Sequence, residues 1–412
     1  MSERRNLNRL IASSAMSNLA DGMLQITLPL VTLGITRDPG AFAAVTFVER
    51  LPWLLFALHA GALADRLDRR RTMTLVNLGR ALLLAAFAAI VAAKAEQLWT
   101  LYVVAFVLGI GETLFDTAAQ SILPTIVADK AQLSKANGQL SAVERITNQF
   151  IGPTLGALVA AVALAASLGA SAAAYGFASV ALLTLVGQFR AVRSGPPTRI
   201  RTDIAEGVRY LGRHPLLRPL AICVGVSNLA STMMFAVFPL YAIEPGPVGA
   251  SKIGYALLLT TLSAGVLVGS LFAHRTERAL GIRRSLLIAS ASFPLFSLVP
   301  ALTESWAWLA VGFFAGALLS GGWNVITVSL RQRIVPDELL GRVNAGYRLL
   351  AWGTMPIGAA LAGVTASQFG LRATFAISAA ISTVCLPIVF VAVTNRRLDE
   401  YQPEVAQVTT AS

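Results

Sequence analysis

Nine ionisable side chains stand inside long apolar runs of this sequence, where charge or protons could be held and moved. They are Asp21, Glu49, Arg50, Arg80, Glu112, Asp116, Glu144, Arg145 and Arg348. An ionisable group in an apolar medium costs roughly 2.5–3.5 kcal/mol on insertion scales, so each needs a partner, water or a function. All five acids lie in the first half of the chain, so we expect ionic chemistry mainly there.

Proton binding is the chemistry that these acids suggest. Glu112 and Asp116 are four residues apart, so they share one face of a helix. Two close carboxylates repel each other, and uptake of a proton relieves the repulsion. We therefore predict Asp21, Glu112 and Asp116 as proton carriers. The alternative is that one of them pairs with Arg80 or Arg145 and never exchanges a proton.

Uncharged polar side chains accompany Asp21 on its helix. Asn18, Asp21 and Gln25 are spaced i, i+3 and i+7, which puts them on one face that should line water. The alternative is hydrogen bonding between helices with no role for a substrate. The residues predicted to line a cavity are Asn18, Gln25, Glu49, Arg50 and Asn228.

The elements that position these residues are membrane-spanning helices. Of 412 residues, 55% are hydrophobic and 13% are charged, with a mean hydropathy of +0.67; soluble domains carry about 25% charged residues. About 20 apolar residues cross a bilayer. The runs predict twelve spans, at roughly 10–34, 42–64, 73–93, 98–122, 138–165, 171–189, 218–242, 252–273, 285–302, 306–330, 342–366 and 372–394.

Composition argues against other classes of protein. The net charge of +12 comes from basic residues between apolar runs, which argues against nucleic-acid binding. Cys223 and Cys385 lie inside apolar runs, and the three histidines are too far apart for a metal site. There is no phosphate-binding glycine loop. We expect no enzyme activity, no cofactor, no metal, and membrane lipids as partners.

Charge in the loops predicts the orientation. Most of the 33 Lys and Arg residues lie on the side of the termini and even-numbered loops, whereas the opposite loops hold only Arg37, Lys94, Lys252 and Arg372. The positive-inside rule then puts both termini in the cytoplasm. We expect a multi-pass protein of a bacterial inner membrane, with no cleaved signal peptide.

An internal repeat divides the chain. Ser17–Asp21 recurs as Ser227–Ser231, at an offset of 210 residues, and several weaker matches share nearly that offset. We predict two six-helix bundles, residues 1–190 and 218–394. A cytoplasmic linker, residues 191–217, should contain a helix lying on the inner leaflet, since Ile204, Val208 and Leu211 form an apolar stripe. Residues 395–412 should form a disordered cytoplasmic tail.

The charged turn after the second span resembles the signature loop of major facilitator superfamily transporters. The matching residues are Gly61, Leu63, Ala64, Asp65, Arg66, Arg69 and Arg70, whereas Asp68 stands where that family has glycine. The alternative is an ordinary cytoplasmic loop. The resemblance implies parallel bundles that rock around a central cavity, with Asp65 locking the inner gate. We expect Arg80, Asp116, Glu144, Arg145 and Arg348 to close that gate by pairing across the halves, or to form a static ion cluster.

The fifth span points to export. Gly152, Pro153 and Gly156 resemble a helix-bending motif of superfamily exporters, although an arginine that many proton-coupled drug exporters carry is absent near Ala105 or Phe106. Stretches such as 49–53, 112–124 and 341–344 resemble the enterobactin exporter and macrolide efflux branch. This resemblance implies export of amphipathic molecules such as drugs, antibiotics or siderophores. We expect a monomeric secondary active exporter, in which the carboxylates inside the spans suggest proton antiport. The alternatives are a lipid or lysolipid translocator and a non-transporting membrane sensor.

Overall fold

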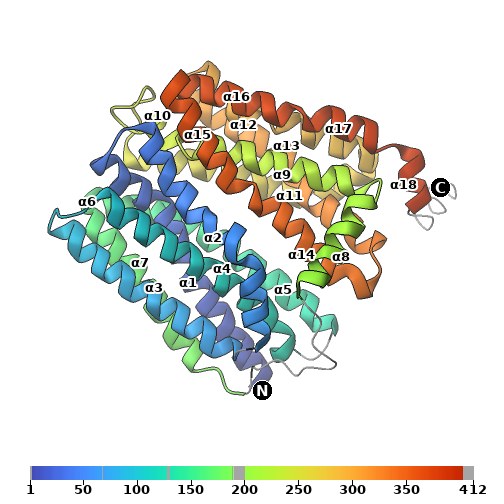
Figure 1. The fold of residues 1–412 in the computed structure, drawn as a ribbon, viewed down its shortest axis with the longest axis horizontal. Coiled ribbons are helices and arrows are strands. Elements are labelled where there is room, and N and C mark those ends of the chain that lie inside the picture. Colours follow the sequence, from blue (N-terminus) through green and yellow to red (C-terminus); the bar gives the residue numbers. More distant parts are fainter. Residues whose placement is uncertain (1, 67, 128–129, 188, 190–199, 402–412) are drawn as a thin grey trace. The chain divides into compact units, whose positions relative to one another are not determined.

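The computed structural model describes residues 2–66, 68–127, 130–187, 189 and 200–401. Within these ranges the chain is helical and contains no strand beyond one isolated bridge between Ile243 and Ala250 (Figure 1). Nine described segments are long and apolar enough to cross a membrane. The prediction of an all-helical polytopic protein is therefore confirmed.

The first half of the chain contains eight described helical elements. They are α1 (Ser2–Ile35), α2 (Pro39–Arg66), α3 (Arg69–Ala92), α4 (Leu98–Ile126), α5 (Lys130–Arg145), the π-helix η1 (Ile146–Ile151), α6 (Gly152–Val162) and α7 (Leu164–Leu183). They overlap the six spans predicted there. The fifth span is not one continuous α-helix, because η1 interrupts it.

The remaining described helices begin with α8, which lies in the predicted linker. They are α8 (Ile200–Arg213), α9 (Leu217–Phe235), α10 (Phe238–Ala242), α11 (Lys252–Ser292), α12 (Leu295–Leu302), α13 (Trp306–Ile334), α14 (Asp337–Gly353), α15 (Met355–Phe369), α16 (Leu371–Thr383), α17 (Cys385–Ala392) and α18 (Asn395–Tyr401). They overlap the other six predicted spans. Gly281, with φ 78° and ψ 163°, breaks α11 between predicted spans eight and nine.

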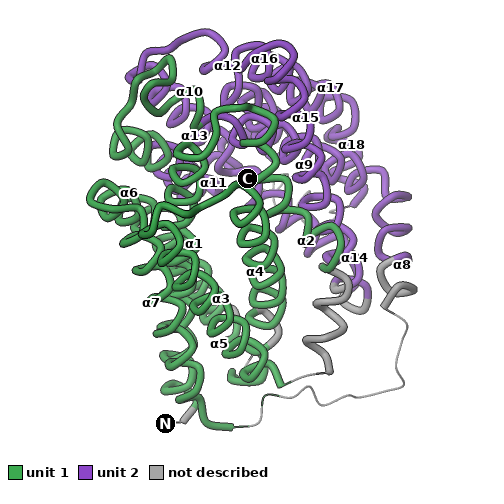
Figure 2. The backbone as a smooth tube through the Cα atoms, turned by 60° about the vertical axis from the view of Figure 1, so that its left-hand side comes forward, with its two compact units in different colours: residues 1–197, 239–260 green, residues 198–238, 261–412 purple. Residues whose placement is uncertain are grey.

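The chain divides into two compact units (Figure 2). Unit 1 comprises Met1–Pro197 and Pro239–Thr260, and unit 2 comprises Thr198–Phe238 and Thr261–Ser412. The segment 239–260 therefore groups with unit 1, whereas the predicted boundary put it in the second bundle. Two hydrogen bonds hold it there: Arg37 Nη2 donates to the Glu244 carbonyl at 3.3 Å, and Lys252 Nζ donates to the Ala160 carbonyl at 3.2 Å.

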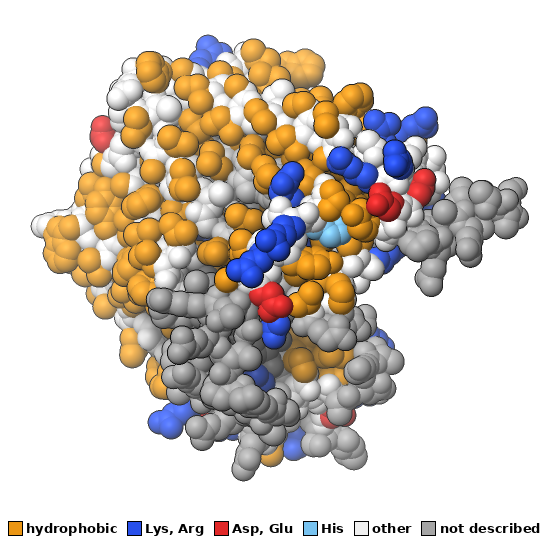
Figure 3. Space-filling model, turned by 45° about the vertical axis from the view of Figure 1, so that its right-hand side comes forward, with side chains coloured by type: hydrophobic (Ala, Val, Ile, Leu, Met, Phe, Trp, Pro, Cys, Tyr) orange, Lys and Arg blue, Asp and Glu red, His pale blue; other side chains and the backbone are white. Residues whose placement is uncertain are grey.

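Apolar side chains face outward as well as inward. Leu82 is 64% exposed, Phe177 67% and Val391 69%. Figure 3 shows a face on which hydrophobic side chains cover much of the described surface. Large exposed apolar areas are unfavourable in water and suit a lipid solvent. Lipid thus surrounds helices whose inner faces hold the polar residues described below.

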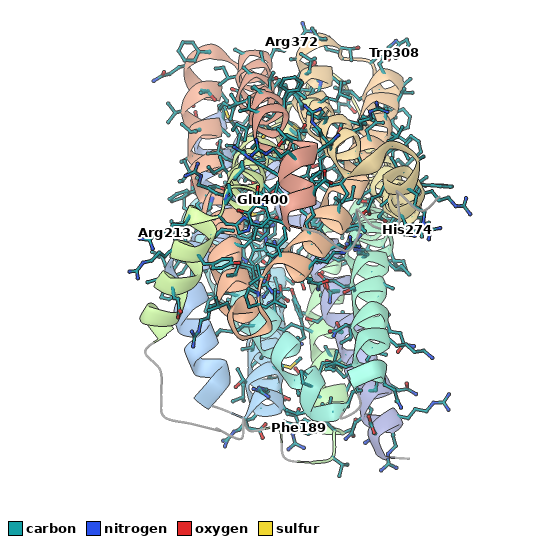
Figure 4. All side chains as sticks on the ribbon, turned by 90° about the vertical axis from the view of Figure 1, so that its right-hand side faces the viewer. Phe189, Arg213, His274, Trp308, Arg372 and Glu400 are labelled. Carbon is teal, nitrogen blue, oxygen red and sulfur yellow. The ribbon has the colours of Figure 1, made fainter. Side chains whose placement is uncertain are left out.

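Two arginines of unit 2 that the sequence assigned to opposite sides of the membrane, Arg372 in an outer loop and Arg213 in the cytoplasmic linker, lie apart (Figure 4). Trp308 and Arg372 lie at one end of this unit, and Arg213 lies well away from them (Figure 4). Arg372 Nη1 is 3.6 Å from Glu304 Oε1, an exposed ion pair between two predicted outer loops. An exposed pair of this kind contributes little to stability.

The linker helix α8 forms, but its apolar side meets protein. A side chain at Gly207 would collide with the carbonyl of Arg342, and Val208 contacts Gly346. Leu211 is 1% exposed and packs in a cluster with Val343. The prediction that the stripe lies on the inner leaflet is therefore wrong for Val208 and Leu211, which pack against α14, and the side chain of Ile204 lies outside the described residues.

The residues after the last span also differ from expectation. Asn395–Tyr401 form α18, with Leu398 buried in the core of unit 2. The predicted disordered tail therefore starts too early in the chain. The rest of that prediction, residues 402–412, lies outside the described residues.

Candidate functional site

A buried ionic cluster joins three helices of unit 1. Arg80 Nη2 of α3 donates to Asp21 Oδ1 of α1 at 2.6 Å, and the Tyr175 hydroxyl of α7 donates to the same oxygen at 2.6 Å. The Arg80 guanidinium carbon lies 4.4 Å from the centre of the Tyr175 ring. Arg80 is 4% exposed, Tyr175 0%, and the Asp21 side chain 19%. Asp21 is thus the member of this cluster that solvent reaches best.

Small neighbours make room for the arginine. A Cβ at Gly111 of α4 would lie 2.8 Å from Arg80 Cδ, so glycine leaves a path for this long side chain. One turn before Arg80, the side-chain carbonyl oxygen of Asn77 accepts a hydrogen bond from Ser17 Oγ at 3.4 Å.

Both hydrogen bonds to the Asp21 carboxylate end on Oδ1, and within the described chain no hydrogen bond to Oδ2 is seen. Oδ2 is therefore the oxygen of the cluster that can still accept a proton.

A second ionic group in unit 1 is more open. Arg50 Nη2 lies 3.5 Å from Glu49 Oε1, and Arg50 Nη1 lies 3.5 Å from Glu112 Oε1. The Arg50 side chain is 30% exposed, and the two carboxylates are each 26% exposed. Gly109 lets α4 approach the Glu49 backbone closely. Long, partly solvated contacts of this kind are weaker than the Asp21–Arg80 pair.

Three amide side chains form a third polar group. Gln25 Nε2 donates to Asn148 Oδ1 at 2.5 Å, and Asn148 Nδ2 is 3.5 Å from Asn18 Oδ1. Asn18 and Asn148 are half-buried, and Gln25 is exposed. These amides join α1 to η1, and their exposed edge could bond to a polar group of a ligand.

The helix-bending motif lies directly after this amide group. Gly152 begins α6, with Pro153 in its first turn, and the Gly152 amide bonds back to the Thr147 carbonyl in π register. A Cβ at Gly152 would lie 2.7 Å from Gly22 Cα, and a Cβ at Gly156 would lie 2.7 Å from the Met23 carbonyl. The glycines therefore bring α6 into backbone contact with α1.

The structure brings together some of the predicted residues and separates others. Asp21 and Arg80 pair inside unit 1, although the sequence grouped Arg80 with the inner-gate charges. Glu144 is exposed and Arg145 half-buried at the end of α5, and Asp116 is half-buried on α4. In unit 2, Asn228 Nδ2 donates to the Ala351 carbonyl at 2.6 Å, and the exposed Arg348 lies 5.5 Å from the Trp352 ring.

Only part of the signature loop is described. The backbone of Gly61, Leu63, Asp65 and Arg66 is helical, but their side chains lie outside the described residues. Arg70 Nη1 donates to the Leu185 carbonyl at 2.6 Å, and the Arg69 amide is 3.4 Å from the Phe189 carbonyl. Asp68, which replaces the family's glycine, caps α3 by accepting from the Arg71 amide at 2.9 Å.

Three residues of these groups were absent from the predictions. Tyr175 lies in an Ala-rich helix and is the partner of Asp21. Asn77 is 0% exposed beside the ionic cluster, and Asn148 is the centre of the amide group. An amide or phenol inside an apolar run was the available signal, because such groups need a hydrogen-bond partner when buried.

A family model described as a transmembrane secretion effector matches residues 4–409. The multidrug efflux pump Tap of Mycolicibacterium fortuitum is 26% identical over 386 residues, covering 90% of this chain and 92% of that protein. Macrolide efflux protein A of Streptococcus pyogenes is 25% identical over 400 residues, covering 92% of this chain and 93% of that protein.

Solved structures share the fold. The nucleoside transporter NupG is similar with a TM-score of 0.72 and 12% identity, covering 94% of this chain and 98% of the other. An inward-facing, occupied bacterial homologue of the lysosomal transporter Spinster gives 0.73 at 12% identity, covering 94% and 96%. The fold is that of the major facilitator superfamily.

Proposed function

Because the chain belongs to the transmembrane secretion effector family of the major facilitator superfamily, we propose that it is a proton-coupled exporter of amphipathic small molecules. It is a multi-pass transporter of efflux type and not an enzyme. The relatives named multidrug and macrolide efflux pumps support drugs and macrolides as cargo. The proposed mechanism is alternating access in a bacterial inner membrane, with both termini cytoplasmic and the protein a monomer.

The main support for proton coupling is that two hydrogen bonds to the Asp21 carboxylate share a single oxygen. Arg80 and Tyr175 both donate to Oδ1, while the carboxylate keeps 19% exposure. A proton taken up at Oδ2 removes the charge that holds Arg80 to α1. The buried guanidinium then lacks a counter-charge, which is unfavourable by several kcal/mol unless the helices rearrange. Protonation would thereby drive α1 and α3 apart, and release of the proton would restore the pair.

The more open carboxylates support a second step. Glu112 contacts Arg50, its neighbour Gly111 packs against Arg80, and Asp116 follows Glu112 by one turn on α4. We propose that Glu112 and Asp116 pass protons between solvent and Asp21. Arg50 lies 3.5 Å from both Glu49 and Glu112, so it would keep one carboxylate partner when the other takes up a proton.

The inner gate is proposed on sequence grounds. Asp65 would lock it, with Glu144, Arg145 and Arg348 as further charges that pair when the cavity faces outward. Glu144 and Arg348 are exposed, at the end of α5 and in α14 respectively. Replacement of Asp65 by Asn, at normal expression, should abolish transport if this gate is used.

Transport into inverted membrane vesicles tests the function. A panel of macrolides, lipophilic cations, siderophores and lysolipids is offered with and without an imposed pH gradient, acid inside. We expect gradient-driven accumulation of one or more amphipathic drugs by the native protein. An Asp21→Asn variant that inserts normally should lose this dependence. Accumulation of lysolipid alone would instead favour a lipid translocator, and unchanged coupling in the variant would exclude Asp21.

A further inference from the structure

The π-helix in the fifth span of unit 1 is an irregularity that the Gly-Pro motif alone does not require. Proline removes a backbone donor and bends a helix, but it does not force a whole turn into π register. Here Ile146–Ile151 form that turn, and the Gly152 amide bonds to the Thr147 carbonyl five residues back. A π turn is less stable than an α turn and is found mostly at functional sites. A further interaction must therefore stabilise the π register of η1.

Asn148 supplies that support. Its Oδ1 accepts from Gln25 at 2.5 Å, its Nδ2 faces Asn18 Oδ1 at 3.5 Å, and its own carbonyl lies 3.5 Å from Gln25 Nε2. The same carbonyl fits against α1, where a Cβ at Gly22 would come within 2.5 Å of it. One side chain on η1 is therefore tied to two positions of α1 about two turns apart.

The two ends of the interrupted helix are fixed differently. On the outer side, Gly152 and Gly156 pack α6 against the α1 backbone. On the inner side, α5 packs in the core of unit 1 through Ala136, with Leu133 and Leu140, and its last turn carries the exposed Glu144. A change in η1 would therefore move this last turn of α5 more readily than α6. A shift by one residue turns an α-helix by about 100°.

Unit 2 contains a matching arrangement. Asn228 occupies the repeat position of Asn18, 210 residues on. It donates to the Ala351 carbonyl at 2.6 Å, next to the break between α14 and α15, where Thr354 Oγ1 donates to the Gly225 carbonyl at 2.9 Å. In each unit, an asparagine of the first spanning helix thus bonds to a residue at or near the break in the fifth spanning helix: Asn18 to Asn148, and Asn228 to Ala351. A recurrence in both units favours a mechanical role over chance.

We propose that Asn148 is a positioning residue for transport, which holds η1 in π register until a hydrogen-bonding group of the cargo takes the place of Asn148 as the partner of Gln25. The cargo feature is a hydroxyl, carbonyl or amide presented at the exposed edge of the amide group. Release lets η1 relax towards α register and rotates the end of α5, which redirects Glu144 and Arg145. The release of η1 by cargo rests on the proposed function. The support of η1 by Asn148 is independent of that function.

Spin-label distances test the support of η1 without any cargo. Labels at Asn8→Cys on α1 and Gln139→Cys on α5 are introduced after Cys223 and Cys385 are replaced by alanine. Both label sites are exposed in unit 1. Asn148→Leu keeps the size of the side chain and removes both bonds, and Gln149→Leu on the same turn is the control. We expect a changed distance distribution in Asn148→Leu and the parent distribution in Gln149→Leu.

Transport kinetics with erythromycin, a macrolide rich in hydroxyl groups, test the coupling. Asn148→Leu should lower kcat by about tenfold or more with less than about threefold change in KM, since a positioning residue acts on turnover rather than on binding. In the parent, erythromycin should shift the spin-label distances, and in Asn148→Leu it should not. Gln25→Leu, which removes the same bond from the α1 side, should give a smaller change of the same kind.

Two results would overturn the proposal. One is a spin-label distribution in Asn148→Leu and in Gln25→Leu that equals the parent's. The other is a rise in KM with unchanged kcat, which would make Asn148 an ordinary cargo contact. If the parent moves no member of the vesicle panel, the proposed function fails, but the distance comparison without cargo still decides whether Asn148 holds η1.

Discussion

Among the described residues, each unit buries an arginine over a tyrosine ring, and the two arginines differ in what else they contact. In unit 1, Arg80 lies 4.4 Å from the Tyr175 ring and bonds to Asp21 at 2.6 Å. In unit 2, Arg331 lies 3.9 Å from the Tyr347 ring and is 8% exposed, and in the described part of that unit it forms no ion pair with a carboxylate. A proton can neutralise the partner of the first arginine but has no such partner to neutralise at the second.

The cores of the two units, away from these arginines, differ in the same direction. Phe238, Phe313 and Phe375 are fully buried in unit 2, with ring centroids 5.3 and 6.3 Å from Phe238. Aromatic packing of this kind does not respond to protons. Unit 1 instead joins α1, α3 and α7 through one carboxylate. The proposed proton response therefore belongs to unit 1, whereas the aromatic core of unit 2 is expected to be structural.

The largest expected effect is that of Asp21→Asn. Removal of one partner of a buried ion pair costs about 3–5 kcal/mol, because Arg80 stays buried without its counter-charge. We expect a lower unfolding temperature in detergent and loss of gradient-driven transport. The double variant with Arg80→Gln should recover much of the unfolding temperature and none of the coupling. Recovery of both would show that the pair is only structural.

Tyr175→Phe should have a smaller effect. The ring that lies against Arg80 is kept, and only the hydrogen bond to Asp21 Oδ1 is lost, which is worth about 1.5–3 kcal/mol for a charged acceptor. Unfolding temperature should fall by less than in Asp21→Asn, and coupled transport should slow without being abolished. Complete loss of transport in a well-folded Tyr175→Phe would mean that the hydroxyl itself carries the proton.

Arg331→Met tests the corresponding arginine–tyrosine contact in unit 2. It removes a cation–π contact worth about 0.5–2 kcal/mol and keeps much of the length of the side chain. We expect modest destabilisation and an unchanged dependence of transport on the pH gradient. A loss of coupling as large as that of Asp21→Asn would contradict the division of roles between the units.

The sequence located the charges but not their pairing. Hydropathy and loop charge predicted the helices, since an apolar run of sufficient length has few alternatives in lipid. Distance along a helix gave the depth of Arg80 but not its face towards α1, so the sequence left open whether Arg80 pairs with an acid such as Asp21 or joins the inner-gate charges. Tyr175 is separated from Asp21 by 154 residues, and no local pattern connects them.

The π-helix η1 and the packing of α8 could not be predicted for a different reason. The Gly-Pro motif predicted a bend, but η1 depends on amide bonds from α1 that only the folded chain supplies. The apolar stripe of α8 has the same pattern whether lipid or α14 covers it, which is why its contact with Val343 could not be predicted. Patterns identify an apolar face, and tertiary packing decides what covers that face.

The smallest expected effect is on the pH dependence of stability. It involves His214, which lies between α8 and α9 in unit 2. Its Nδ1 accepts hydrogen bonds from the Leu216 and Leu217 amides, each at 3.2 Å, and its ring lies 4.6 Å from that of Tyr401. Burial lowers the pKa of His214 below its ordinary value of 6.5. The unfolded chain therefore binds this proton more readily, and stability should fall as pH drops below about 6.5.

Thermal unfolding between about pH 7.5 and 5.5 measures that loss. His214→Asn keeps an acceptor for the two amides but cannot take up the proton, so its unfolding temperature should depend less on pH than the parent's. Gradient-driven transport should be unchanged, because His214 belongs to unit 2 and to none of the proton-carrying groups. An equal pH dependence in both proteins would assign the acid sensitivity to other residues. Impaired coupling in a stable His214→Asn would extend the proton response into unit 2.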